Sequence, residues 1–181
     1  MRSYIILTLI SLIPFMANAQ SNDSIGNFGF SVYSSVNGEL NPIRIVPSLV
    51  YIKGKNQLEL GFGFNPFIRE TQKLMSGEFN YKYYPNGTKN KFNMYLIARF
   101  SYINSSRETF YPTTFNYLFL NGGYGFEIIP KQHVFFGTNL SLGGFTFNKR
   151  SEIPYAAFES QNLFEEIELN LAFQFNVGYR F

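Results

Sequence analysis

Hydrophobic and polar positions alternate strictly along the last part of the chain. In the segment 167–181, one set of alternate positions holds Ile167, Leu169, Leu171, Phe173, Phe175, Val177, Tyr179 and Phe181. The positions between them are mostly polar or small, and the segment 57–65 repeats the same pattern. Because successive side chains of a strand point to opposite faces, a period of two predicts half-buried β-strands.

The same period divides the chain into eight candidate strands. Their ranges are 26–36, 43–52, 57–65, 77–85, 92–102, 115–128, 134–147 and 167–181. Short connections rich in Gly, Pro or Asn alternate with more varied connections, most of which are longer. This pattern predicts an all-β fold, an eight-stranded antiparallel up-and-down transmembrane β-barrel formed by residues 20–181. Pro47 interrupts the second strand, where we expect a bulge or a register irregularity.

All charged residues of the candidate strands fall on the face opposite the apolar one. They are Arg44, Glu59, Glu78, Lys82, Arg99, Glu127, Glu168 and Arg180. Glycine and serine are frequent on the same face, which suits the inside of a narrow barrel. Ionised groups in such a lumen have to pair, so we expect these eight residues to form a charge network that fills it. A filled barrel of eight strands is too narrow for a water channel.

The apolar face carries no ionised residue and is rich in large aromatic side chains. The chain contains 22 Phe and 13 Tyr, and several of them fall near the predicted strand ends, as aromatic girdles at a membrane interface do. A soluble barrel instead needs an outward face rich in Lys and Glu. The pattern therefore favours an exterior that faces lipid.

The N-terminus has the pattern of an export signal. Arg2 precedes an apolar run from Tyr4 to Met16, and Ala17-Asn18-Ala19 is a small-x-small cleavage pattern. The run contains Pro14 and is shorter than the roughly 20 residues of a membrane-spanning helix. We predict a signal peptide over residues 1–19 that is cleaved on export.

The charge and cysteine content narrow the functional classes. The net charge is only +3 and the basic residues are scattered, so we expect no nucleic acid as a partner. The chain has no cysteine, which excludes disulfides and thiolate metal sites.

The last strand resembles that of the small outer-membrane β-barrels of OmpA and OmpX type, most closely the versions common in Bacteroidetes. The matching residues are the alternating apolar positions and the terminal aromatic, namely Phe173, Phe175, Val177, Tyr179 and Phe181. The resemblance implies an outer-membrane location, contact with outer-membrane lipids, and assembly by periplasmic chaperones and by the barrel-assembly machinery, which recognises this strand. It implies architecture rather than a particular activity.

We find no catalytic motif, metal-ligand cluster or cofactor site in the sequence. The only histidine is His133, in a short predicted turn, and the only aspartate is Asp23, ahead of the first strand. A hydroxyl or carboxylate nucleophile without a nearby base is a poor catalyst. We therefore expect a non-enzymatic barrel with a structural, interaction or adhesion role. The alternatives are an outer-membrane lipid-modifying enzyme and an exported soluble barrel that binds a small apolar ligand.

Overall fold

Eight β-strands form the structure, which is a computed structural model. It describes residues 26–37, 43–66, 72–107, 112–131, 133–151 and 160–181. The strands are β1 (Asn27–Asn37), β2 (Arg44–Lys53), β3 (Asn56–Phe64), β4 (Gln72–Tyr83), β5 (Phe92–Arg107), β6 (Thr113–Ile128), β7 (Val134–Ser151) and β8 (Glu168–Arg180). No helix within these ranges has the length and apolar character needed to cross a membrane.

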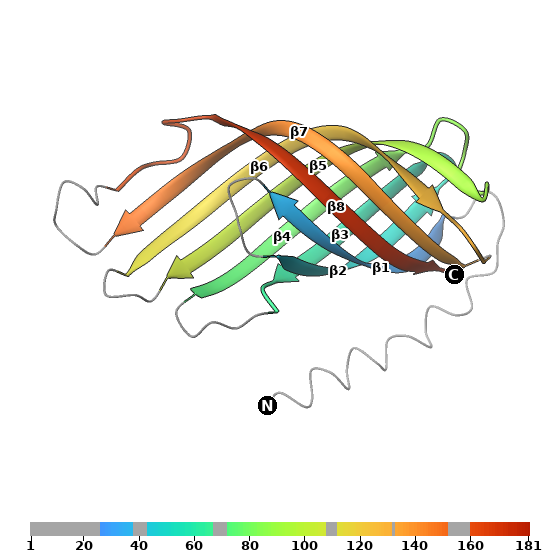
Figure 1. The fold of residues 1–181 in the computed structure, drawn as a ribbon, viewed down its shortest axis with the longest axis horizontal. Helices are drawn as coiled ribbons and strands as arrows, with labels where there is room; N and C mark the ends of the chain where they lie inside the picture. The colour runs from blue at the N-terminus through green and yellow to red at the C-terminus, as the bar shows by residue number, and fades with distance from the viewer. Residues whose placement is uncertain (1–25, 38–42, 67–71, 108–111, 132, 152–159) are drawn as a thin grey trace, which may run out of the picture.

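The strands close into a single antiparallel barrel in sequence order. Each strand pairs with the next, and β8 pairs with β1 (Figure 1). The predicted eight-stranded up-and-down barrel is therefore confirmed. One rim carries the short connections after β2, β4 and β6, and we call it the turn end. The opposite rim, where β1, β3, β5 and β7 finish, is the loop end.

Two glycines allow the tight turns at the turn end. Gly54, between β2 and β3, has a φ of 61°, and Gly87, between β4 and β5, has a φ of 81°. Glycine adopts this left-handed conformation without the steric penalty that a Cβ atom brings. The glycines that the sequence places in the short connections are therefore explained by the backbone conformation of these turns.

The pairing register fixes the width of the barrel. Following paired residues from strand to strand once around the barrel leads from Asn27 to Asn37, ten residues further along β1. Eight strands with this stagger tilt by about 35–45° and enclose a cylinder with a backbone radius of roughly 8 Å. Such an interior has room for side chains and little else.

The predicted strand ends need correction at the loop end. β5 runs to Arg107 and β7 to Ser151, beyond the predicted 102 and 147, and β4 starts at Gln72 instead of 77. The additional residues lie in continuous ladders, for example Gln72 opposite Arg107. Pairing with neighbouring strands extends the sheet past the point where the alternation of apolar and polar residues ends.

The irregularity expected at Pro47 is absent. The register between β2 and β3 is the same on both sides of this residue, with Ile45 opposite Phe64 and Ser48 opposite Gly61. Pro47 pairs with Val32 of β1, and only the β3 partners of Val46 and Pro47 are missing from the ladder. Proline lacks an N–H donor, and its effect here is a local gap in the pairing without a bulge.

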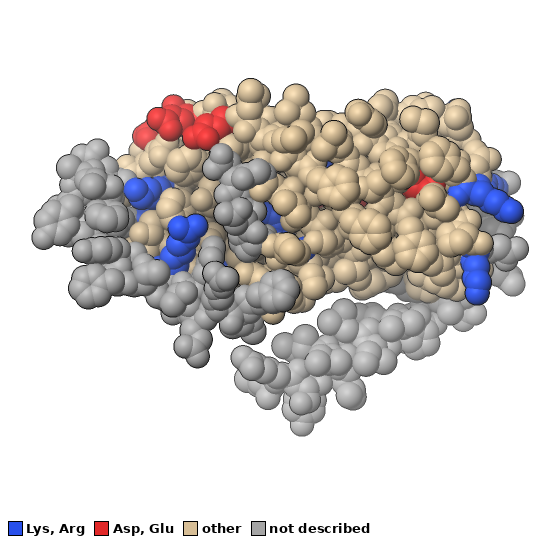
Figure 2. Space-filling view, viewed as in Figure 1, with Lys and Arg blue, Asp and Glu red and all other residues tan. Residues whose placement is uncertain are grey.

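Large apolar side chains cover the outside of the barrel. Leu60, Leu120 and Leu142, for example, are 63%, 67% and 60% exposed. Figure 2 shows a wall almost free of charged atoms between the two ends, with most of the blue and red atoms gathered toward the rims. The inner face carries buried Ser, Asn, Gln, Glu, Lys and Arg side chains. The barrel is therefore apolar outside and largely polar inside, the reverse of a soluble protein.

Small residues on the inner face let adjacent strands approach closely. A Cβ atom on Gly123 would lie 2.6 Å from the Cα of Ser141, and one on Gly143 would lie 2.6 Å from the Cα of Asn121. Gly122 points to the outer face, where the nearest atom to an added Cβ is 4.0 Å away. The glycine content predicted for the lumen thus has a packing reason.

Candidate functional site

The candidate site is the lumen, because the predicted charged residues meet there. Seven of the eight are buried, namely Arg44, Glu59, Glu78, Lys82, Arg99, Glu127 and Arg180. The prediction was wrong for Glu168, which is exposed as the first residue of β8 at the loop end. The period of two gives the direction in which a side chain points but not its depth in the barrel, and Glu168 lies at the rim.

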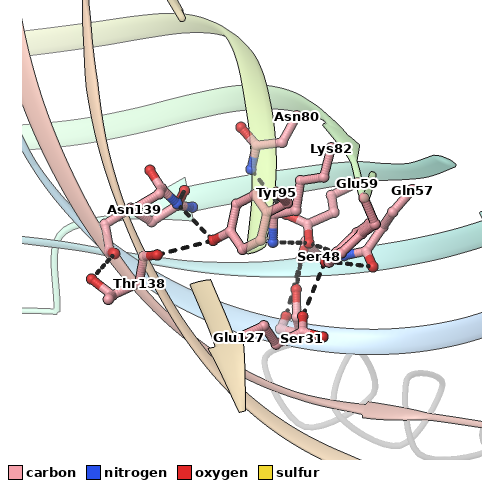
Figure 3. A network of polar contacts seen from close by, with 12 residues as sticks. Ser31, Ser48, Gln57, Glu59, Asn80, Lys82, Tyr95, Glu127, Thr138 and Asn139 are labelled. Carbon is pink, nitrogen blue, oxygen red and sulfur yellow. Dashed lines mark hydrogen bonds and ion pairs between the residues drawn. The ribbon is translucent and has the colours of Figure 1, made fainter. Parts of the chain in front are cut away.

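The first layer of the lumen, near the turn end, is built around Glu59. Its Oε1 atom lies 2.6 Å from Nζ of Lys82, and both side chains are fully buried. Gln57 donates to the same carboxylate at 2.6 Å and Asn80 donates at 3.0 Å (Figure 3). The Lys82 ammonium also lies 5.0 Å from the centre of the Tyr95 ring. Such a charge is tolerated in a buried site because it is paired and hydrogen-bonded.

A second ion pair closes the lumen at the turn end. Nη2 of Arg180 lies 2.7 Å from Oε1 of Glu127 and donates to Oε1 of Gln57 at 2.9 Å. The guanidinium also lies over the Phe135 ring, 4.5 Å from its centre. Tyr84, just after β4, is within hydrogen-bond distance of both Gln57 and Glu127. Burial, reinforced by the Glu127 carboxylate, raises the pKa of the Tyr84 hydroxyl well above its usual range, so it remains a donor.

A third charged group contains two arginines and one carboxylate. Nε of Arg44 lies 3.4 Å from Oε1 of Glu78, and Nη2 of Arg99 lies 3.7 Å from its Oε2. Arg99 also donates to the hydroxyl of Ser35 at 2.8 Å, and Ser76 donates to Glu78 at 3.1 Å. The three charged side chains are almost completely inaccessible to solvent. They come from β2, β4 and β5: Arg99 lies on the strand next to Glu78, whereas Arg44 reaches Glu78 across β3.

Toward the loop end the lumen also contains an apolar cluster, which the pattern of charged residues did not indicate. Leu74, Ile103, Phe119 and Phe145 form a buried cluster, and Tyr117 packs against it. The rings of Phe119 and Phe145 stack with their centres 5.1 Å apart. Tyr117 and Phe119 are an even number of residues from Glu127, which the sequence places on the charged face, so the period of two already implied that they point inward. Most other aromatic side chains of the strands lie on the outer face, so composition alone does not reveal this inner cluster.

His133 makes backbone and ring contacts at the turn end. Its Nδ1 lies 2.8 Å from the backbone oxygen of Arg180, and its ring stacks on Tyr179 with a centroid distance of 5.3 Å. The imidazole thus joins the turn after β6 to the end of β8. Within the ranges that the structure describes, no three His, Asp or Glu side chains come together in a way that would hold a metal ion.

Four of the residues predicted to form an assembly signal lie on the outer face of β8, and the fifth, Phe181, directly follows this strand. Phe173, Phe175 and Tyr179 are exposed, whereas Val177 and Phe181 are half-buried. The backbone N–H of Phe181 donates to the carbonyl of Phe28 at 2.9 Å and so ties the C-terminus to β1. The signal peptide predicted for residues 1–19 lies outside the described residues.

Comparison with known proteins shows a likeness in fold. No family model matches the sequence, and no curated protein is detectably similar to it. The N-terminal β-barrel domain of Pseudomonas aeruginosa OprF aligns with 86% of this chain and 97% of its own, at 11% identity and a TM-score of 0.60. A major outer membrane protein from Thermus thermophilus aligns with 86% of this chain and 99% of its own, at 11% identity and a TM-score of 0.50.

Proposed function

We propose that this chain is an integral outer-membrane β-barrel with a side-chain-filled lumen and a structural or interaction role. The observation that carries the proposal is the distribution of polarity. Ionised side chains lie in pairs inside a closed cylinder, and a continuous band of exposed Leu, Phe and Tyr side chains surrounds it. In water this band would be an aggregation hazard, whereas in lipid it is the favourable surface.

The closed sheet supports a membrane environment. Hydrocarbon offers no partner for unpaired backbone groups, and a barrel closed by β1 and β8 has no free edge. A tilted strand needs about 9–11 residues to cross a bilayer, which β1, β2 and β3 provide. β5, β6 and β7 have 16, 16 and 18 residues, so their surplus extends the wall at the loop end.

Two observations support the outer membrane in particular. The fold resembles a solved major outer membrane protein from Thermus thermophilus, and the sequence predicts an export signal over residues 1–19. Proteins that cross bacterial outer membranes with β-strands do so as closed barrels. We infer that lipids of this membrane contact the apolar band along its whole circumference.

The filled lumen favours a structural or interaction role over transport. The ion pair of Arg180 with Glu127 lies at the turn end, and the cluster around Phe119 lies toward the loop end. Side chains therefore occupy the space through which a pore would run. The tall wall of β5, β6 and β7 is a rigid base for the connections at the loop end. Connections carried on such a scaffold are where a binding partner is most often recognised.

Cysteine labelling tests this placement, because the chain has no cysteine of its own. We would introduce Glu165→Cys at the loop end, Lys91→Cys at the turn end and Leu96→Cys on the wall, one at a time. In intact cells of a Gram-negative host, a membrane-impermeant maleimide should label only Glu165→Cys. After the outer membrane is opened, Lys91→Cys should react as well, and Leu96→Cys should stay protected by lipid.

Cell fractionation is a second test of the proposed membrane location. The protein should sediment with outer membranes and resist alkaline extraction. Recovery in the soluble periplasm without detergent, or equal labelling of all three cysteines in intact cells, would exclude the membrane barrel.

We further propose that the outward residues of β8, together with the C-terminal Phe181, are recognised during assembly by periplasmic chaperones and the barrel-assembly machinery. These residues are Phe173, Phe175, Val177, Tyr179 and Phe181. Phe181→Ala should lower the amount of assembled barrel in cells, and the matched control Phe181→Tyr should retain it. Refolding of purified Phe181→Ala into detergent should be nearly normal, because Phe181 follows the last strand. An equal loss in cells and in the purified system would point to stability and would contradict a recognition role.

A further inference from the structure

Among the residues that the structure describes, the ionised side chains inside the barrel carry one more positive than negative charge. The buried ionised residues of the described chain are the cations Arg44, Lys82, Arg99 and Arg180 and the carboxylates Glu59, Glu78 and Glu127. Lys82 pairs with Glu59 and Arg180 pairs with Glu127, one to one. Arg44 and Arg99 share the carboxylate of Glu78. One positive charge is therefore left over, and it belongs to this group of three.

The two arginines also have hydrogen-bonding capacity to spare. Among the described residues, Nε and Nη2 of Arg44 and Nε of Arg99 have no hydrogen-bond partner, although all three atoms are buried. The distances of 3.4 and 3.7 Å to Glu78 are at or beyond the limit of a good N–H to O hydrogen bond. Unpaired donors of this kind are costly in a buried site, more so when they carry charge.

Arg99 and Glu78 are held in place independently of any ligand. Arg99 donates from Nη2 to Ser35 at 2.8 Å and from Nη1 to Ser141 at 3.4 Å. Ser76 donates to Oε1 of Glu78 at 3.1 Å. The hydroxyls come from β1, β7 and β4, so three parts of the barrel wall position the charged groups.

From this geometry we propose that the lumen binds one small monovalent anion of the chloride class beside Arg44 and Arg99. An arginine does not lose its proton in a protein, so the surplus charge cannot be removed by titration. Water would satisfy the free donors but would leave the charge uncompensated. A monovalent anion does both, whereas a divalent anion would reverse the imbalance. The site lies within the closed barrel and does not depend on the membrane that surrounds it.

Chloride-dependent unfolding of the detergent-refolded full chain tests the site. At constant ionic strength, chloride would be exchanged for gluconate, which is too bulky for the filled lumen. Above the dissociation constant, a tenfold rise in chloride should lower the unfolding equilibrium constant of the unsubstituted protein about tenfold, since folding takes up one ion. Arg99→Gln removes the surplus charge and should abolish this dependence.

Two further variants test whether the effect of chloride on stability follows the positive charge at the site. Glu78→Gln leaves both arginines without a carboxylate, so it should bind chloride more tightly, and its chloride dependence should begin at lower chloride concentrations than that of the unsubstituted protein. Arg107→Gln, at an exposed position of β5, is the matched control and should keep the original dependence. Opposite responses of Arg99→Gln and Glu78→Gln distinguish a bound anion from a general effect of salt on stability.

Bromide locates the ion without relying on the Glu78→Gln variant. Crystals of the protein refolded in bromide should show an anomalous peak beside Arg44 and Arg99. Stability independent of chloride in the unsubstituted protein, or equal chloride dependence in Arg99→Gln and the unsubstituted protein, would overturn the proposal. A bromide peak only at surface lysines would overturn it as well.

Discussion

The ion pair between Lys82 and Glu59 gives the sharpest test of how much the buried charges of the lumen contribute to the free energy of unfolding. Both side chains are fully buried and their charged atoms are 2.6 Å apart, so solvent does not screen the interaction. Removing one partner of a buried pair costs about 3–5 kcal/mol, because the other charge is left uncompensated. The two partners are not equivalent, however, because their remaining contacts differ.

Glu59→Gln should be the more damaging substitution. It leaves the Lys82 ammonium facing the Tyr95 ring, whose centre is 5.0 Å away, without a carboxylate to pair with. Lys82→Met leaves the Glu59 carboxylate with donors from Gln57 and Asn80, at 2.6 and 3.0 Å. Charge-assisted hydrogen bonds of this kind contribute about 1.5–3 kcal/mol each. We therefore expect a loss of about 5 kcal/mol for Glu59→Gln and about 3 kcal/mol for Lys82→Met, the two limits of the range for buried pairs.

The double variant separates the pair from its surroundings. Glu59→Gln with Lys82→Met should lose less than the sum of the two single variants, by about 2–3 kcal/mol. Urea unfolding of detergent-refolded protein, followed by far-ultraviolet circular dichroism, measures all three. Lys91→Met, at an exposed turn position, is the control and should leave the free energy of unfolding unchanged. Losses that add within about 0.5 kcal/mol in the double variant would refute the coupling.

The remaining predictions concern the wall and the apolar cluster. Leu96→Arg, on the outer face between the two rims, should destabilise the barrel in lipid vesicles by about 2–4 kcal/mol, whereas Leu96→Phe should be tolerated. Gly123→Ala should lose about 1–3 kcal/mol because its Cβ would meet the backbone of β7, and Gly122→Ala, on the open outer face, should be neutral in the same urea titration. Phe119→Ala should lose about 3–5 kcal/mol by opening a cavity in the loop-end cluster, and equal stability to the unsubstituted protein would show that the cluster is loosely packed.

The direction in which each strand side chain points could be read from the amino-acid sequence. The alternation in 57–65 and 167–181 is a local property, because the period of two follows from the backbone of a single strand. It separated Leu60 and Leu171, which are exposed, from Glu59 and Ala172, which are buried. The turns needed no tertiary information either, since Gly54 and Gly87 have the positive φ angles that favour glycine.

Only the tertiary structure determines how deep each residue lies in the barrel and which residues it contacts. Glu168 shares its face with buried Asn170 but lies at the rim, and the ends of β5 and β7 follow their partner strands. Arg180 of β8 meets Glu127 of β6 across β7, a contact set by the registers of β7 with both neighbouring strands. Arg44 of β2 reaches Glu78 of β4 across β3 in the same way. The direction in which a side chain points follows from the period of two within one strand. The depth of that side chain in the barrel and the identity of its partners depend on the registers of the strands together.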